Sequence, residues 1–171
     1  MRYPFNNYYG IYSLHIYTPI ISYIMLKSKL LNHNNLCVSS LNTKVTDSSP
    51  LIAMNCLQAI SYSDNRSIFK LHSKGMITTV NGDKCIQSLH LSDNIELTDC
   101  AKANVFGDDR EKWTVDYEGK IVSIKHDNVC IGIDLNDNND ILPLHTLDIK
   151  VNSEQNDNKH KAIHAFTLGD N

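Results

Sequence analysis

Five cysteines carry most of the chemistry that residue type and spacing reveal in this chain. They are Cys37, Cys56, Cys85, Cys100 and Cys130. None belongs to a Cys-x-x-Cys pair, and no two histidines have the spacing that completes a Cys2His2 zinc site, so we expect no metal. Cys37 and Cys56 are 19 residues apart. Cys85 and Cys100 are 15 residues apart. These intervals favour two local disulfides, each worth about 3 kcal/mol, which would require an oxidising compartment. We therefore predict a secreted protein or one of the secretory pathway.

The fifth cysteine, Cys130, has no local partner. We interpret it as a small buried hydrophobic residue, with intermolecular pairing as the alternative. The sequence contains no glycine-rich phosphate loop, no Gly-x-Ser-x-Gly elbow and no His-Glu-x-x-His motif. The adjacent acids Asp108 and Asp109 are better explained by a turn than by paired catalytic carboxylates. We therefore expect neither an enzyme nor a cofactor.

The size and charge of the chain limit its partners. A length of 171 residues fits one domain, or one domain with a short leader. The formal net charge of −3 gives no broad basic surface, so nucleic acid is not an expected partner. Basic and acidic residues are interspersed, which is typical of a solvated surface.

The N-terminal segment is apolar from residue 10 to residue 26 (GIYSLHIYTPIISYIML). Several tyrosines, His15 and Pro19 interrupt it, and Arg2 is the only basic residue upstream. No small-residue cleavage site follows, and the length is marginal for a membrane span. Two interpretations stay open: a signal or membrane anchor, or an incomplete leader whose end enters the fold.

The rest of the chain contains three copies of one pattern. Each copy has a first cysteine, an apolar segment and an aromatic residue, and the first two copies add a second cysteine and a later glycine. First cysteines recur after 48 and then 45 residues. In both complete copies the aromatic follows the second cysteine by 13 residues and precedes the glycine by 6. So many equal intervals indicate an internal repeat. The three aromatics are Phe69, Trp113 and Phe166.

Short strands are the predicted structure of each repeat. The residues from 95 to 98 and from 120 to 124 alternate between apolar and polar types, and turn residues such as Asn81-Gly82-Asp83 separate such stretches. No stretch inside the repeats keeps a helical period over ten positions. Four strands in each of three repeats predict an all-β, closed or pseudo-symmetric fold.

The order of cysteine, strand ending in cysteine, aromatic strand and glycine-led strand resembles the ricin B-type lectin repeat. The resemblance covers about residues 24–168 and implies a β-trefoil with three pseudo-symmetric four-stranded repeats. It gives a domain over 24–171 with repeats of about 24–68, 69–112 and 113–171, after a leader of residues 1–23. It also implies that Phe69, Trp113 and Phe166 occupy the aromatic position of the family's Gln-x-Trp motif and cover the core of each unit.

The resemblance further implies a shallow sugar pocket on each repeat. The family pocket uses an Asp two residues after the first cysteine, an aromatic near the second cysteine, and an Asn just before Gln-x-Trp. Carboxylate and amide groups bind sugar hydroxyls, and the aromatic ring stacks on the apolar face of the sugar. None of the three copies keeps the full set. The residues found are Ser39, Gln87 and Gly132 for Asp; Met54, Thr98 and Leu142 or a neighbour for the aromatic; Arg66, Arg110 and Ile163 for Asn; and Ser67, Glu111 and His164 for Gln.

Three polar residues remain as candidates for sugar binding: Gln87, Asp134 and His145. The third copy also lacks the second cysteine, and either Leu144 or Asn152 could stand in its place. We favour Leu144, which makes residues 154–161 a polar insertion.

We therefore predict a carbohydrate-binding module whose partner is a glycan or glycoprotein. One alternative is a trefoil that lost its sugar sites and binds a protein. Another is a targeting module of a larger glycan-active enzyme. Association with a membrane depends on the N-terminal segment and is left open.

Overall fold

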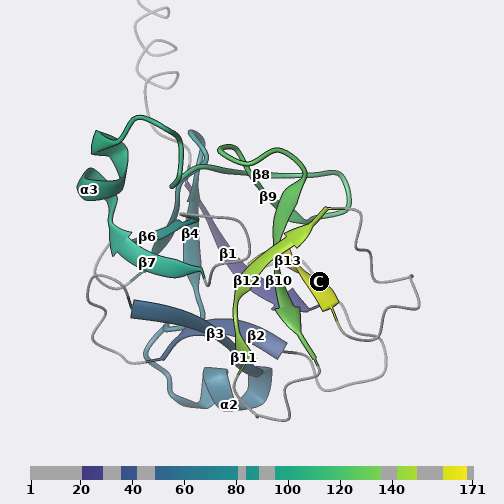
Figure 1. Cartoon of the computed structure of the whole chain (residues 1–171). Coiled ribbons are helices and arrows are strands. Elements are labelled where there is room, and N and C mark those ends of the chain that lie inside the picture. Colours follow the sequence, from purple (N-terminus) through teal and green to yellow (C-terminus); the bar gives the residue numbers. More distant parts are fainter. Residues whose placement is uncertain are drawn as a thin grey trace, which may run out of the picture.

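Short antiparallel strands, separated by turns, form three successive units (Figure 1). The computed structural model describes residues 21–28, 36–41, 49–80, 84–88, 95–135, 142–149 and 160–168. The first unit contains β1 (Ile21–Ser28), β2 (Leu36–Ser40), β3 (Ser49–Asn55), α2 (Cys56–Ser61) and β4 (Phe69–His72). The second contains β5 (Ile77–Thr79), β6 (Lys84–Gln87), β7 (Glu96–Asp99), α3 (Cys100–Val105) and β8 (Trp113–Val115). The third contains β9 (Ile121–Ser123), β10 (Val129–Asp134), β11 (Leu142–Pro143), β12 (His145–Asp148) and β13 (His160–Thr167).

Six of the strands close into a barrel. β1 pairs with β4 and β13, β4 pairs with β5, and β8 pairs with β9. Two isolated β-bridges complete the ring. Met76 with Lys112 connects β5 to β8, and Lys120 with His164 connects β9 to β13. The ring therefore has no free edge along which another chain could add a strand. This barrel, with one hairpin per unit, is the arrangement that the threefold repeat predicts.

The three hairpins meet at one point on the barrel axis. They are β2–β3, β6–β7 and β10–β12. The Leu144 N–H donates to the Leu51 carbonyl at 3.2 Å, and the Ile95 N–H donates to the Leu144 carbonyl at 2.8 Å. All three side chains are buried. Equivalent residues of the three units therefore touch at the pseudo-threefold axis.

Phe69 and Trp113 lie fully inside the core, as the repeat predicts. The indole N–H of Trp113 donates to the Ile86 carbonyl at 2.9 Å, so its only polar atom is satisfied. The two aromatics hold equivalent places, because Phe69 pairs with Thr79 and Trp113 pairs with Ser123. Each of them therefore covers the core of its own unit.

The third aromatic does not follow this pattern, and the prediction for Phe166 is wrong. Its side chain is 37% exposed on the barrel wall, with the Lys27 ammonium 5.1 Å from the ring centroid. The fully buried Ile163 takes the core position instead, because it pairs with Ser28 as the other two pair with Thr79 and Ser123. The third unit therefore uses an aliphatic side chain where the first two use a ring.

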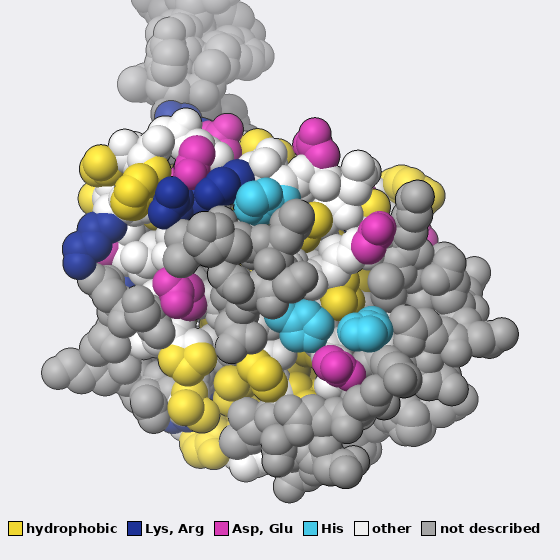
Figure 2. All heavy atoms as spheres, viewed as in Figure 1, with side chains coloured by type: hydrophobic (Ala, Val, Ile, Leu, Met, Phe, Trp, Pro, Cys, Tyr) yellow, Lys and Arg dark blue, Asp and Glu magenta, His cyan; other side chains and the backbone are white. Residues whose placement is uncertain are grey.

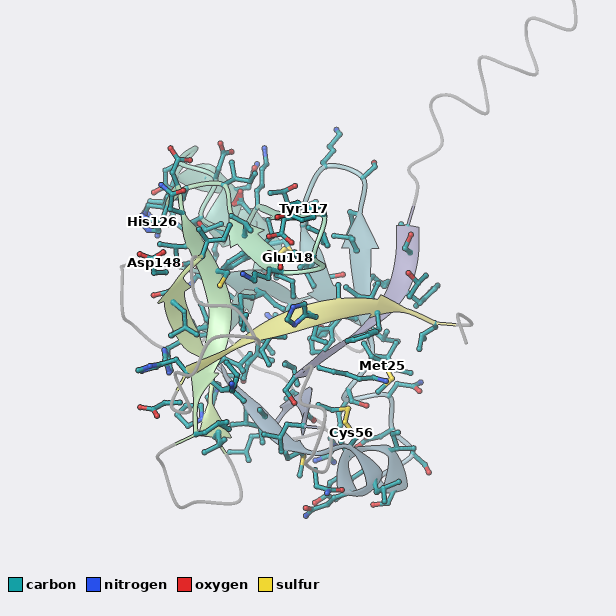
Figure 3. The ribbon with its side chains drawn as sticks, turned by 90° about the vertical axis from the view of Figure 1, so that its right-hand side faces the viewer. Met25, Cys56, Tyr117, Glu118, His126 and Asp148 are labelled. Carbon is teal, nitrogen blue, oxygen red and sulfur yellow. A yellow bond between two sulfur atoms is a disulfide. The ribbon has the colours of Figure 1, made fainter. Side chains whose placement is uncertain are left out.

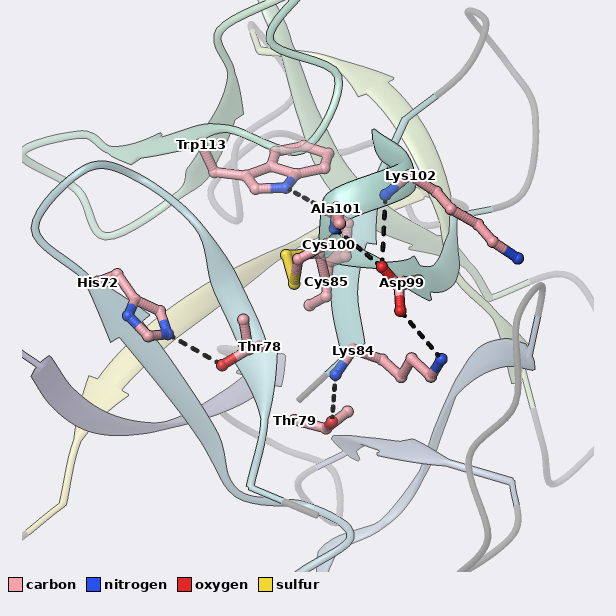
Figure 4. The surroundings of a disulfide bond; sticks show 11 residues. His72, Thr78, Thr79, Lys84, Cys85, Asp99, Cys100, Ala101, Lys102 and Trp113 are labelled. Carbon is pink, nitrogen blue, oxygen red and sulfur yellow. Dashed lines mark hydrogen bonds and ion pairs between the residues drawn. A yellow bond between two sulfur atoms is a disulfide. The ribbon is translucent and has the colours of Figure 1, made fainter. Parts of the chain in front are cut away.

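The two predicted disulfides, Cys37–Cys56 and Cys85–Cys100, are both present. Each joins the first strand of a hairpin to the first residue of a six-residue helix. The helices begin there because the Asn55 or Asp99 side chain accepts hydrogen bonds from the first free N–H groups. Figure 4 shows this arrangement around Cys85 and Cys100. Met25 packs against the first disulfide's apolar cluster, beside Cys56 (Figure 3).

The described part of the third unit contains neither a disulfide nor a helix. Asp148 pairs with Val129, just as Asn55 pairs with Leu36 and Asp99 with Lys84. The position of the missing cysteine is therefore Ile149, so our preference for Leu144 is wrong; Asn152 lies outside the described residues. The Ile149 carbonyl accepts a hydrogen bond of 2.9 Å from the buried Lys120 ammonium. This hydrogen bond thus holds the third unit at the position where each of the other two units has a disulfide.

Cys130 is buried and free, in agreement with its interpretation as a core residue. It lies in a small apolar cluster with Leu147 and Ala162. Burial raises the pKa of its thiol to about 11, because a thiolate there would lose its hydration. The thiol is therefore protonated at physiological pH.

The described barrel begins at Ile21, three residues before the predicted start of the domain. The end of the apolar N-terminal segment is thus a barrel strand. Residues 1–20 lie outside the described part, so the predicted leader stays a prediction. Among the described residues, no helix is long and apolar enough to cross a membrane.

Candidate functional site

The carboxylate position of the family pocket holds no acid in this chain. Ser39 and Gln87, two residues after the first cysteines, are both buried. The Gln87 amide donates to a carboxylate oxygen of Glu96, its cross-strand partner, at 3.0 Å. This candidate is therefore engaged inside its own hairpin. In the third unit Gly132 offers no side chain at all.

The platform position is apolar or small in each unit. Strand pairing identifies it as the residue opposite the first cysteine. It is Met54, Thr98 and, in place of the expected Leu142, Leu147; all three are buried. Leu147 also fills the space over Gly132, where an added Cβ would stand only 2.0 Å from the leucine Cδ1. The described strands therefore present no ring at this position.

The amide position also changes in the third unit. Arg66 stands three residues before Phe69, and Arg110 stands three residues before Trp113. With Ile163 as the third core residue, the equivalent position is His160, and the glutamine position is Lys161 instead of His164. The sequence alone favours Phe166 as the core residue. That choice places the amide and glutamine positions three residues too far along the chain.

In the first unit Arg66 is bound within its own turn. Its guanidinium donates to both carboxylate oxygens of Asp64, at 2.6–3.0 Å, and to the Leu41 carbonyl at 3.2 Å. It also stacks on Tyr62, with 3.9 Å between the guanidinium carbon and the ring centroid. The hydrogen bonds to Asp64 raise the pKa of Arg66. Asn65 has a φ of 61°, a left-handed conformation that Asn adopts more readily than most residues.

The second unit repeats the aspartate–arginine pair and the stacked ring of this turn, with Phe106 in place of Tyr62. Arg110 donates to the two oxygens of Asp108 at 2.9 and 2.8 Å and stacks on Phe106 at 3.7 Å. Lys125 adds an ion pair to Asp108 at 3.0 Å. The Arg110 hydrogen bonds hold the pKa of Asp108 well below its usual range. Asp109 has a φ of 61°, as Asn65 has in the first unit.

The third unit has a different group of polar side chains at the corresponding corner. Asp134 and His160 are cross-strand partners, and 4.0 Å separates the carboxylate Oδ2 from the imidazole Nε2. His145 lies on the other side of β10, opposite Gly132, and its ring is 6.4 Å from that of His160 in an edge-on arrangement. Figure 2 shows two histidine side chains next to an acidic one over this part of the surface.

The structure thus brings together two of the three predicted candidates, Asp134 and His145, and leaves Gln87 in the second unit. His160 is an additional member of the group. The sequence would have pointed to His160 if Ile163 had been taken as the core residue, because the amide position lies three residues before it. No group of three or more His, Cys, Asp or Glu side chains among the described residues has a geometry that could hold a metal ion.

The closed six-stranded barrel with three hairpins defines a β-trefoil. Residues 23–158 match the ricin-type beta-trefoil lectin domain, so the chain belongs to that family. This confirms the resemblance found in the repeat. No protein with a curated description matches the sequence.

Solved structures with the same fold include three that are instructive. The C-terminal half of an earthworm R-type lectin, solved with GalNAc, is 16% identical with a TM-score of 0.60, over 85% of this chain and 99% of that one. ThreeFoil, a designed threefold symmetric protein, is 16% identical with a TM-score of 0.58, over 83% and 97%. The β-trefoil lectin of the Vibrio vulnificus hemolysin/cytolysin, solved with N-acetyl-D-lactosamine, is 14% identical with a TM-score of 0.54, over 85% and 96%. At these identities the likeness establishes the fold.

Proposed function

We propose that this chain is a secreted carbohydrate-binding module whose third unit carries a sugar site at Asp134, His145 and His160. The observation that supports the proposal is the meeting of these three side chains at one corner of the trefoil. The carboxylate accepts hydrogen bonds from vicinal hydroxyls, and each imidazole can donate one and accept one. The two disulfides suit the oxidising compartment that secretion implies.

The comparison among the units favours the third as the site. In the first two units the residue at the amide position is an arginine whose charge is neutralised by an aspartate of the same turn. In the third unit, about a third or more of each of the Asp134 and His160 side chains faces solvent. Their 4.0 Å separation is too long for a strong hydrogen bond. A ligand hydroxyl could therefore lie between the two side chains and hydrogen-bond to both.

The proposal is tested by screening the full chain on a glycan array and then measuring affinities by calorimetry. GalNAc and N-acetyl-D-lactosamine are suitable first probes because related folds were solved with them. Asp134→Asn and His160→Ala should each weaken binding about tenfold or more, as expected for the loss of a hydrogen bond to a charged group. Asp127→Asn removes an exposed acid outside the group and is the matched control.

Two results would contradict this function. The first is an array without any glycan above background at neutral pH. The second is sugar binding that Asp134→Asn and His160→Ala leave as strong as Asp127→Asn does. In that second case the chain would bind sugar, but elsewhere.

A protein-binding role is the second candidate, and exposed aliphatic side chains on the two helices favour it. Leu57 on α2 is 80% exposed and Val105 on α3 is 81% exposed. Large apolar side chains in water can mark a contact with another protein. An affinity pull-down in excess free sugar that still recovers one partner would support this role. Loss of the partner on adding sugar would count against it.

A further inference from the structure

Asn65 lies in the turn between α2 and β4 and begins a motif that the proposed function does not use. Of the 19 asparagines in the chain, it is the only one with a serine or threonine two residues later. Asn-x-Ser is the acceptor motif for N-linked oligosaccharides in secreted proteins. The Asn65 side chain is exposed, whereas Arg66 is half-buried and Ser67 is buried. The residue that would carry an oligosaccharide is therefore the one that faces solvent.

The backbone of the turn explains only part of this motif. Asn65 has a φ of 61°, and its carbonyl accepts the Ile68 N–H at 3.1 Å. Asp109 has the same φ at the equivalent place in the second unit, where Glu111 follows two residues later. Asn and Asp both suit a left-handed conformation. The backbone thus accounts for an Asn or an Asp in each turn, but it does not require the serine of the first unit.

The helix before this turn exposes an apolar face that the second unit does not have. Leu57 and Ile60 are three residues apart, so they lie on one side of α2, and they are 80% and 55% exposed. Counted from the cysteine that begins each helix, the equivalent residues on α3 are Ala101 and Asn104. Two large aliphatic side chains are therefore in water only on the helix that precedes the acceptor motif.

Backbone contacts join the turn of Asn65 to this apolar surface. The Ser63 N–H donates to the Ile60 carbonyl at 3.0 Å, and the Arg66 guanidinium donates to the carbonyl of Leu41. Leu41 itself is 42% exposed. Figure 2 shows hydrophobic side chains on the lower part of the surface, in the region where Figure 1 shows α2 and β3. An oligosaccharide on Asn65 would therefore begin beside exposed apolar side chains.

We propose that Asn65 carries an N-linked oligosaccharide that covers the apolar face of α2. The proposal rests on the secreted state, which is part of the proposed function, and it concerns a covalent modification instead of a site for a glycan ligand. The two disulfides need the same oxidising compartment. A bulky polar oligosaccharide would keep Leu57 and Ile60 from contacting other molecules.

The modification is a group transfer to the side-chain amide of Asn65. The amide nitrogen forms a bond to the anomeric carbon of an oligosaccharide and loses one proton. The bond from that carbon to a lipid pyrophosphate carrier breaks, and the carrier leaves with the electron pair. Because Ser67 is buried in the folded chain, the transferring enzyme has to recognise its hydroxyl before the turn closes.

The test is secretion of the full chain from cultured eukaryotic cells, followed by mass spectrometry of the peptide that contains Asn65. An amidase that removes N-linked oligosaccharides and leaves aspartate identifies the modified residue. We expect a mass increase that the amidase removes, and its complete loss in Asn65→Asp and in Ser67→Ala. Asn65→Asp should keep the fold, because Asp109 has the same φ in the second unit. Asp109→Asn is the matched control: it places an exposed amide in the equivalent turn without a serine two residues later, and it should carry no oligosaccharide there.

A second measurement tests the covering of α2. After removal of the oligosaccharide, the folded chain should bind more of a hydrophobic fluorescent dye, and the double variant Leu57→Ser, Ile60→Ser should show no such rise. Unchanged dye binding would overturn the covering role.

The outcomes separate this site from the proposed function. A secreted chain with an unmodified Asn65 would overturn the site and leave the proposed function standing. Retention in the cytosol with free thiols at the four paired cysteines would overturn the secreted state and this site with it. A glycan array without any binding would overturn the sugar-binding function and leave the modification of Asn65 standing.

Discussion

Trp113 offers a quantitative test of how the second unit holds its core. Its side chain is buried, and the indole N–H donates to the Ile86 carbonyl at 2.9 Å. Replacement by phenylalanine keeps an aromatic ring but removes this donor. A buried carbonyl left without its partner costs about 1–3 kcal/mol. The lost volume of about 40 Å³ adds about 1 kcal/mol at about 24 cal/mol per Å³ of cavity. Trp113→Phe should therefore lower the free energy of unfolding by about 2–4 kcal/mol.

The matched control is Phe69→Leu at the equivalent position of the first unit, where the side chain has no polar atom. A shape change without a lost hydrogen bond should cost about 1–1.5 kcal/mol. Both variants are measured by urea unfolding followed by far-ultraviolet circular dichroism, because Trp113 is the only tryptophan and its fluorescence is absent from its own variant. Equal costs for the two variants would refute the reasoning, since the hydrogen bond to Ile86 would then contribute nothing.

Four further outcomes follow from the structure. Replacing Cys85 and Cys100 together by serine should cost about 3 kcal/mol in urea unfolding, the value for a loop of this length, and an unchanged midpoint would contradict it. Gly132→Ala should cost about 1–3 kcal/mol in thermal unfolding, because the new Cβ meets a leucine side chain and a backbone carbonyl; a stabilised variant would show that the site relaxes freely. The pKa of Asp108 is depressed by hydrogen bonds from its neighbouring arginine, so this contribution is present above about pH 4 and is lost as the pH falls. Asp108→Asn should therefore lose less stability than the unmodified chain on acidification below pH 4, and parallel curves of melting temperature against pH would refute this. Because burial raises the pKa of the Cys130 thiol to about 11, it should react with a thiol reagent at pH 8 only after unfolding, and rapid labelling of the native chain would contradict its burial.

The first two units illustrate what short-range patterns can predict. The disulfide partners are 19 and 15 residues apart, and the aromatics Phe69 and Trp113 follow the second cysteine at one fixed interval. The interval from the second cysteine to the aromatic is the same in both units because each unit places its helix and its next barrel strand in the same order after the cross-link. Equal spacing in the sequence therefore corresponds to equal places in the fold.

The third unit illustrates where this reasoning fails. It lacks the second cysteine, and its last strand contains both Ile163 and Phe166 within an apolar stretch. The sequence favours the aromatic, but pairing with β1 places Ile163 opposite Ser28 and turns Phe166 to the outside. Since the amide position lies three residues before the core residue, the choice between Ile163 and Phe166 decides whether His160, the cross-strand partner of Asp134, is recognised. The predicted group therefore lacked His160.

The sequence by itself determined the threefold repeat, the two disulfides and the ricin-type family, because these depend on residue types and on intervals along the chain. It did not reveal the stacking of Arg66 on Tyr62 or of Arg110 on Phe106. Only the tertiary structure decided which polar side chains meet. Cross-strand register is set by closure of the barrel, and a strand that shifts by a few residues presents different side chains at the same corner.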